Sequence, residues 1–87
     1  MIDLQIRQQL AQYLANEISL KDFQDWFVPN TWELEKRTNN QGALDVRNTI
    51  DLAVAELTNG HLSEDELQRR LLPLVQTYVV QINFSSR

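Results

Sequence analysis

The chain has 87 residues, no cysteine and a formal charge of −4, and these features exclude several classes of protein. Without cysteine there is no disulfide framework and no thiolate metal site, and an acidic chain lacks the basic footprint that nucleic-acid binding requires. The N-terminal segment lacks the apolar run of a signal peptide, and no apolar stretch reaches the length of a membrane span. We therefore expect a single cytoplasmic domain over residues 1–87, with no nucleic-acid partner and no membrane partner.

The first predicted helix covers residues 3–17. Asp3 stands where a carboxylate can cap the helix and interact favourably with the positive end of its dipole. Apolar residues recur at spacings of three and four, which is typical of a helix with one buried face. They are Ile6, Leu10, Tyr13 and Leu14.

The second predicted helix covers residues 19–28, where the Ser19 hydroxyl can accept a hydrogen bond from the backbone three residues on. Its aromatic residues recur at helical spacing and are Phe23, Trp26 and Phe27. Pro29 is expected to end the helix, because the residue before a proline is pushed out of the helical region. A further short turn of helix is expected after Asn30, before a polar loop at residues 37–42.

Two longer helices are predicted in the second half of the chain, over residues 43–58 and 64–78. Gly60 is a strong stop after the first of them, because glycine accepts the positive φ of a C-terminal cap. The last helix begins with a capping box at residues 63–66, the clearest local signal in the sequence. Pro73 lies inside its pattern and removes one backbone donor, so we expect a kink near residue 70 or a break into two helices.

The final segment, residues 79–87, has a different pattern, because its apolar residues alternate with polar ones as in a β-strand. They are Val80, Ile82 and Phe84. An extended tail is therefore expected, which packs on the bundle or pairs with a second copy of the chain. The predicted fold is all-α: a compact bundle of four main helices with a kinked last helix and an extended C-terminal tail. The predicted core consists of Ile6, Leu10, Leu14, Phe23, Phe27, Val46, Ile50, Val54, Leu67, Leu71 and Leu74.

The chain is poor in the residue types that carry catalysis or hold metals. It has one histidine, His61, in the turn between two helices, and it has no cysteine, which leaves little room for a nucleophilic triad. The ligand spacings of zinc sites and a glycine-rich phosphate loop are also missing. Asp51 follows Arg47 by one helical turn, so an ion pair within the helix explains the carboxylate at this position. We expect no catalytic residue, no metal and no cofactor, and therefore no enzyme.

The feature that most suggests a function is an aromatic cluster interleaved with acids at residues 22–35. Residues 1–35 carry six acids against two bases, a local charge of −4. Phe23 and Phe27 are expected in the core, whereas Trp26 and Trp32 are equally compatible with core and surface positions. A tryptophan with an acidic rim suits a basic protein partner, because tryptophan is enriched at binding hot spots and rim charge speeds encounter. The predicted protein-binding residues are Asp22, Asp25, Trp26, Trp32, Glu33 and Glu35.

The order of core-type residues in the first third of the chain resembles one known family. The pattern runs through Leu10, Tyr13, Leu14, Ile18, Ser19, Phe23, Trp26 and Phe27. It is similar to the first helical hairpin of small bacterial immunity proteins of the colicin D type. The resemblance implies a small acidic helical bundle that binds and blocks a basic, RNA-cleaving toxin domain, and it assigns no functional residue of this chain individually.

Three functions are compatible with these patterns. The leading hypothesis is a non-enzymatic protein-binding module, immunity-like in character, that uses residues 22–35. The alternative is a structural domain that self-associates as a homodimer through the C-terminal tail. An enzyme that works with carboxylates alone ranks last, because most acids fall at helix starts and on polar faces, where capping and solubility explain them.

Overall fold

The computed structural model describes the backbone of residues 2–85 and the side chains of residues 2–76. This part of the chain consists of helices and loops without a strand, which confirms the all-α class. Its elements are, in chain order, α1 (Ile2–Leu14), α2 (Leu20–Thr31), the short 3-10 helix η1 (Leu34–Lys36), α3 (Gln41–Thr58) and α4 (Glu64–Ser85).

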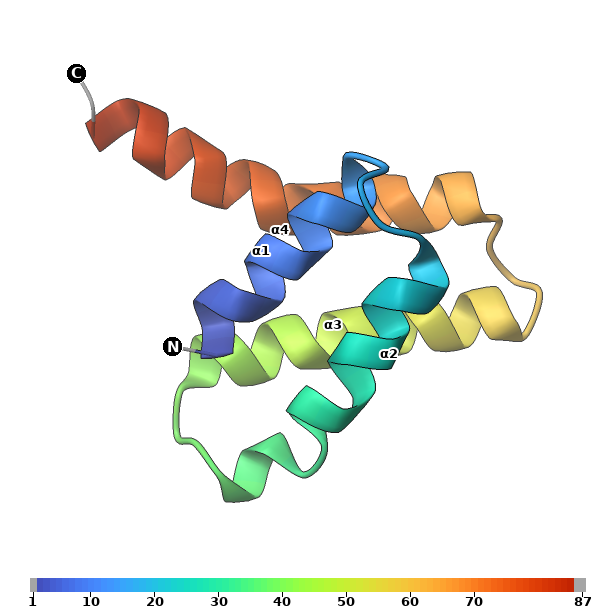
Figure 1. Ribbon diagram of the computed structural model, residues 1–87, viewed down its shortest axis with the longest axis horizontal. Coiled ribbons are helices and arrows are strands. Elements are labelled where there is room, and N and C mark those ends of the chain that lie inside the picture. The colour runs from blue at the N-terminus through green and yellow to red at the C-terminus, as the bar shows by residue number, and fades with distance from the viewer. Residues whose placement is uncertain (1, 86–87) are drawn as a thin grey trace.

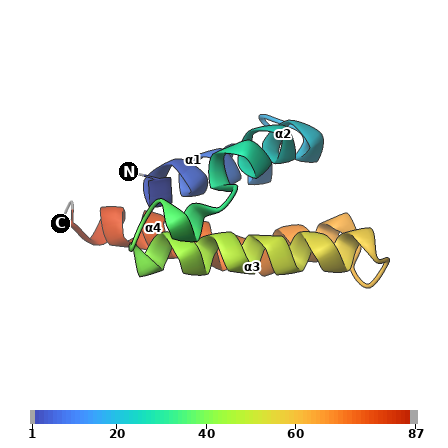
Figure 2. The same cartoon turned by 90° about the horizontal axis from the view of Figure 1, so that it is seen from below.

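The helices are arranged in two layers. Figure 1 shows α3 and α4 side by side and running in opposite directions, and Figure 2 shows α1 and α2 lying over them. The helix α1 packs against α2, α3 and α4, so it is the element that joins both layers. The segment that leads from α2 through η1 lies over the first half of α3 (Figure 2), and the candidate site is found there.

A single cluster of apolar side chains lies between the layers. The predicted core residues that are fully buried are Ile6, Leu10, Phe23, Phe27, Val46, Ile50, Leu67 and Leu71. Three others are half-buried at the edge of the cluster: Leu14, Val54 and Leu74. The buried apolar side chains that our predicted core left out are Tyr13, Leu34, Ala43, Ala53 and Val75. Three aromatic rings stack in sequence, with centroid distances of 6.0 Å from Tyr13 to Phe23 and 5.4 Å from Phe23 to Phe27.

Local hydrogen bonds mark the helix starts, mostly as predicted. The Ser19 hydroxyl caps α2 by accepting from the backbone N–H three residues on, at 3.0 Å. The capping box of α4 is confirmed in both directions, because the Ser63 N–H donates to Glu66 Oε1 (3.0 Å) and the Glu66 N–H donates to Ser63 Oγ (3.2 Å). Asp3 lies inside the first turn of α1 and not at its cap, and its carboxylate pairs with Arg7 at 2.9 Å.

Two helices end in the same backbone motif. After α1, Asn16 adopts a left-handed conformation (φ 63°), its N–H donates to the Tyr13 carbonyl, and the next N–H donates to the Gln12 carbonyl. This motif closes α1 at Leu14, before the predicted end at residue 17, because the left-handed residue turns the chain away from the helix axis. The same pair of bonds follows α3, where Gly60 has φ 81°, and the predicted stop at Gly60 is thus confirmed.

The expected effects of the two prolines are wrong. Pro29 does not end α2, which continues to Thr31 with a kink in place of a stop. Pro29 and Asp25, whose carbonyl loses its helical donor to this proline, are both exposed, so water can serve that carbonyl. Pro73 lies inside α4, which is a single helix, so the predicted break into two helices is absent. The kink that we predicted in this last helix is found in α2 instead.

The prediction of an extended C-terminal tail is also wrong. Residues 79–85 continue α4, and the helix runs past the rest of the bundle in Figure 1. An isolated strand would leave its backbone groups without partners, whereas a helix pairs each of them within the segment. The expectation for residues 86–87, and any contact of the side chains of Val80, Ile82 and Phe84, lies outside the described residues.

Candidate protein-binding surface

Two large apolar side chains are exposed where α2 ends. Trp32 is the C-cap residue of α2 and has left the helical conformation (φ −60°, ψ 125°). Its side chain is 69% exposed, and Val28, one turn earlier, is 54% exposed. Isolated exposed apolar residues are common, but two that border the same hollow mark a candidate interaction site.

These two residues border a groove of about 390 Å³ between the end of α2, η1 and the first half of α3. We call it the Trp32 groove, and its lining residues are Val28, Thr31, Trp32, Glu33, Glu35, Arg47 and Asp51. The lining contains three carboxylates and one guanidinium, which gives a formal charge of −2. The groove therefore combines an apolar edge with an acidic lining.

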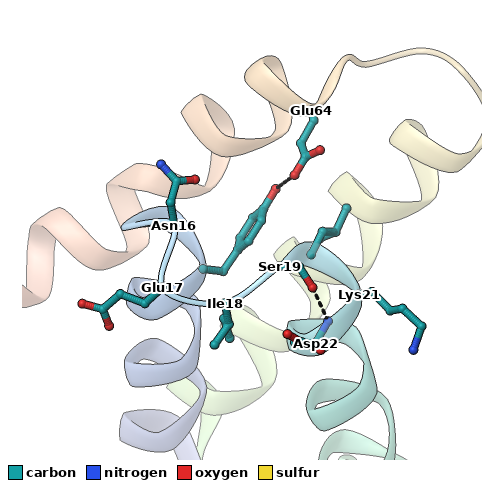
Figure 3. A pocket seen from close by; sticks show the side chains of 9 residues that line it. Asn16, Glu17, Ile18, Ser19, Lys21, Asp22 and Glu64 are labelled. Carbon is teal, nitrogen blue, oxygen red and sulfur yellow. Dashed lines mark hydrogen bonds between the residues drawn. The ribbon is translucent and has the colours of Figure 1, made fainter.

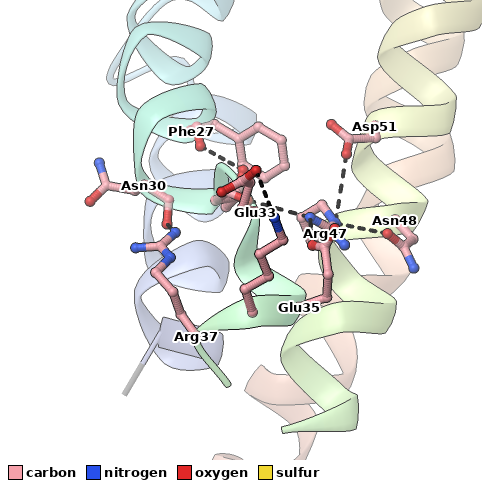
Figure 4. Close-up of polar contacts among 10 residues, drawn as sticks. Phe27, Asn30, Glu33, Glu35, Arg37, Arg47, Asn48 and Asp51 are labelled. Carbon is pink, nitrogen blue, oxygen red and sulfur yellow. Dashed lines mark hydrogen bonds and ion pairs between the residues drawn. The ribbon is translucent and has the colours of Figure 1, made fainter. Parts of the chain in front are cut away.

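Arg47 holds the groove together, as Figure 4 shows. Its side chain is only 14% exposed. One guanidinium nitrogen donates to the Thr31 carbonyl (3.3 Å) and to the Glu35 carboxylate (3.1 Å), and another lies 3.7 Å from the Asp51 carboxylate. The predicted ion pair between Arg47 and Asp51 is therefore confirmed, and the contacts to α2 and η1 are additional. Arg47 thus ties α3 to the segment that carries Trp32.

The electrostatics of the two carboxylates beside Arg47 differ. The pKa of Glu35 is lowered by a hydrogen bond from its own backbone N–H and by the Arg47 guanidinium. Burial raises the pKa of Asp51, and the charge of Arg47 opposes that rise. Glu35 is consequently ionised at neutral pH and contributes a full negative charge to the groove.

Glu33 has an unusual backbone and an exposed partner. It adopts the left-handed conformation (φ 51°, ψ 39°) that turns the chain from α2 into η1. This conformation costs a residue with a side chain roughly 1–2 kcal/mol. Its carboxylate lies 3.2 Å from the Lys36 ammonium, and both side chains are exposed. An exposed pair of this kind contributes little stability, because water competes for both charges.

The other three predicted site residues lie elsewhere on α2. Asp22 is in the first turn, at the opposite end of the helix from Trp32. Asp25 forms an exposed ion pair with Lys21 at 2.7 Å. Trp26 is half-buried and packs against the core. The structure therefore brings together Trp32, Glu33 and Glu35 but not Asp22, Asp25 or Trp26.

Sequence reasoning missed four lining residues of the Trp32 groove: Val28, Thr31, Arg47 and Asp51. Val28 follows Phe27 directly, and nothing in the sequence separates an exposed valine from a buried one at that point. Arg47 and Asp51 carry a local signal, their spacing of one helical turn, but that signal predicts only a pair within α3. Their place beside Trp32 depends on how α3 packs under η1.

A second, polar pocket of about 530 Å³ lies between the α1–α2 loop and the start of α4. The buried Tyr13 lines this pocket, and its hydroxyl donates to Glu64 Oε2 at 2.7 Å. Figure 3 shows Glu64 on one side of the pocket and Ser19, at the start of α2, on the other. Burial and this carboxylate raise the pKa of Tyr13 to about 12. The phenol therefore stays protonated at neutral pH and holds α1 against α4.

Among residues 2–76, whose side chains are described, no group of three histidine, cysteine, aspartate or glutamate residues is placed to hold a metal ion. None of the described helices combines the length and the apolar character needed to cross a membrane. No family model matches this sequence, and comparison with curated proteins and with solved structures found no match.

Proposed function

We propose that this chain is a non-enzymatic protein-binding domain that holds a basic segment of a partner protein in the Trp32 groove. The observation that carries the proposal is the position of Trp32, which is 69% exposed at the edge of a hollow with Val28 beside it. Tryptophan is the residue most enriched at binding hot spots, because it buries a large area with little loss of conformational freedom.

The charge around Trp32 favours a basic partner. The groove carries a formal charge of −2 and the whole chain carries −4, so both the local and the long-range field attract cations. The C-terminal end of α2 adds the negative pole of a helix dipole at the same place. Because the chain has no cysteine, a reducing compartment suits it, and we place this function in the cytoplasm.

The resemblance to bacterial immunity proteins bears on the fold and leaves the interface open. Its pattern includes Leu10, Tyr13 and Phe23, which are buried and hold the first helical hairpin together. An immunity-like role therefore remains a proposal that a toxin partner would have to support. The alternative of self-association through paired tail strands is weakened, because α4 remains helical to Ser85.

The proposal is tested with a photo-crosslinking amino acid placed at residue 28 or, as the matched control, at residue 52. Leu52 is 62% exposed, similar to Val28, but does not line the groove. Expressed in the native host, the residue-28 variant is expected to capture a protein that the residue-52 variant does not. Trp32→Ala is expected to abolish this capture.

Binding is then measured with the purified partner. Trp32→Ala is expected to weaken the complex by about 30-fold or more, the effect of losing a hot-spot residue. The thermal stability of the domain should hardly change, because substitutions of exposed residues usually alter the free energy of unfolding by less than about 0.5 kcal/mol. Equal capture from residues 28 and 52, or a complex that tolerates Trp32→Ala, would show that the groove is not the interface.

A further inference from the structure

The C-terminal end of α2 already binds two guanidinium groups of this chain. Arg47 donates to the Thr31 carbonyl and to Glu35 inside the groove. Arg37 donates to the Asn30 carbonyl at 2.7 Å. Both guanidinium groups thus donate to backbone carbonyls at the C-terminal end of α2, where the helix has no backbone N–H left to donate to them. The chemistry of this region matches planar groups with several N–H donors.

Among the three carboxylates of the groove, Glu33 is the one whose cationic partner is itself exposed. Glu35 is hydrogen-bonded to the buried Arg47, whose side chain is held on three sides. Glu33, by contrast, pairs with an exposed lysine, Lys36, through a single contact of 3.2 Å. Because such an exposed contact is weak, an incoming cation can replace the lysine at little cost. Glu33 also directly follows the exposed Trp32.

We infer that the group recognised in the Trp32 groove is an arginine side chain of the partner, an inference that rests on the proposed function. The guanidinium plane of this arginine lies against the Trp32 indole. The guanidinium N–H groups donate to the Glu33 carboxylate and take the place of the Lys36 ammonium. An arginine gains from both contacts, since it stacks on aromatic rings and can donate two parallel hydrogen bonds to a carboxylate. A lysine offers a compact, strongly hydrated charge and gains less from the indole and the carboxylate together.

The inference is tested with three acetylated, amidated peptides of the sequence Gly-X-Leu-X-Gly, in which X is arginine, lysine or the uncharged citrulline. The arginine and lysine peptides carry equal charge, so long-range attraction cancels between them. Binding is followed by NMR titration of the Trp32 indole N–H signal, which is assigned with Trp32→Phe. The half-buried Trp26 supplies a second indole signal as an internal control.

We expect the arginine peptide to bind about fivefold tighter than the lysine peptide, because the guanidinium donates one hydrogen bond more to the carboxylate than an ammonium does. Citrulline should bind most weakly. Lys36→Ala should strengthen arginine binding by about twofold, because Glu33 is released from its exposed partner. Glu33→Gln should reduce the difference between the two charged peptides, whereas the control Leu52→Ala should leave it unchanged.

The possible failures are distinguishable. If both charged peptides shift the Trp32 signal and bind equally, the preference for arginine is wrong and a basic partner in the groove still stands. If no peptide shifts the Trp32 signal at millimolar concentration, the arginine inference is overturned, and the crosslinking experiment with residues 28 and 52 decides the proposed function separately.

Discussion

Replacing Tyr13 by phenylalanine is expected to remove one hydrogen bond that joins α1 to α4 and leave the packing unchanged. Tyr13 is only 2% exposed, and its ring stacks on Phe23 at 6.0 Å. Its hydroxyl donates to Glu64 Oε2 at 2.7 Å. Phenylalanine keeps the ring in the core and deletes only the hydroxyl, so the substitution measures this contact.

The expected loss at neutral pH is about 1 kcal/mol of the free energy of unfolding, the usual net value of a hydrogen bond in a protein. Bonds to charged groups reach about 1.5–3 kcal/mol, but Glu64 is exposed, and water takes the place of the hydroxyl in the variant. The ring contacts with Phe23 are kept, so the cost of a core cavity is not added.

The contribution of Tyr13 should depend on pH in the alkaline range. Its pKa rises from 10.0 in the unfolded chain to about 12 in the folded one. The unfolded state therefore loses its proton first, and the stabilisation is complete below pH 10 and is lost between about pH 10 and pH 12. A shift of about two units corresponds to about 2.7 kcal/mol. The hydroxyl faces an open polar pocket, so solvent screening reduces this figure, and we expect it to match the contribution of about 1 kcal/mol from the hydrogen bond.

The assay is urea unfolding followed by circular dichroism for the wild type and Tyr13→Phe at pH 7, 9, 11 and 12. The wild type should be more stable by about 1 kcal/mol up to pH 9, and this advantage should disappear near pH 12. Comparing the two chains cancels the contributions of all other groups that ionise in both. An advantage that stays constant across this range, or a tyrosine absorbance titration complete near pH 10, would refute the reasoning.

Three other substitutions test the groove and the helix ends. Arg47→Met should lower the free energy of unfolding, measured in urea, by about 1–2 kcal/mol, because the Thr31 carbonyl and two exposed carboxylates lose their donor. If Arg47→Lys keeps the full wild-type stability, the planar guanidinium is not needed for these contacts. Gly60→Ala should cost about 1–2 kcal/mol in the same assay, since the residue has φ 81° and nothing near its Cβ position adds a clash. Asn16→Gly, at φ 63°, should stabilise by about 0.5 kcal/mol. An unchanged midpoint for Gly60→Ala would mean that the turn can relax out of its left-handed conformation.

The sequence by itself determined the helices and most of the core, because the signals for both are local. The spacing of Leu10, Phe23 and Leu67 within their own helices marks the buried faces, and each is fully buried. The capping box at residues 63–66 forms within four residues, so no other part of the chain was needed to predict it. Local signals failed at Pro29, where exposure to solvent allows a helix to continue with a kink.

Only the tertiary structure decided where the candidate site lies. Phe27 and Trp32 belong to one aromatic cluster in the sequence, yet Phe27 is buried and Trp32 is exposed, because the chain leaves the α2 axis between them. Arg47 and Asp51 reach the groove because α3 packs beneath η1. Contacts between residues so far apart in the chain depend on the summed packing of all helices, and no pattern within one helix encodes them.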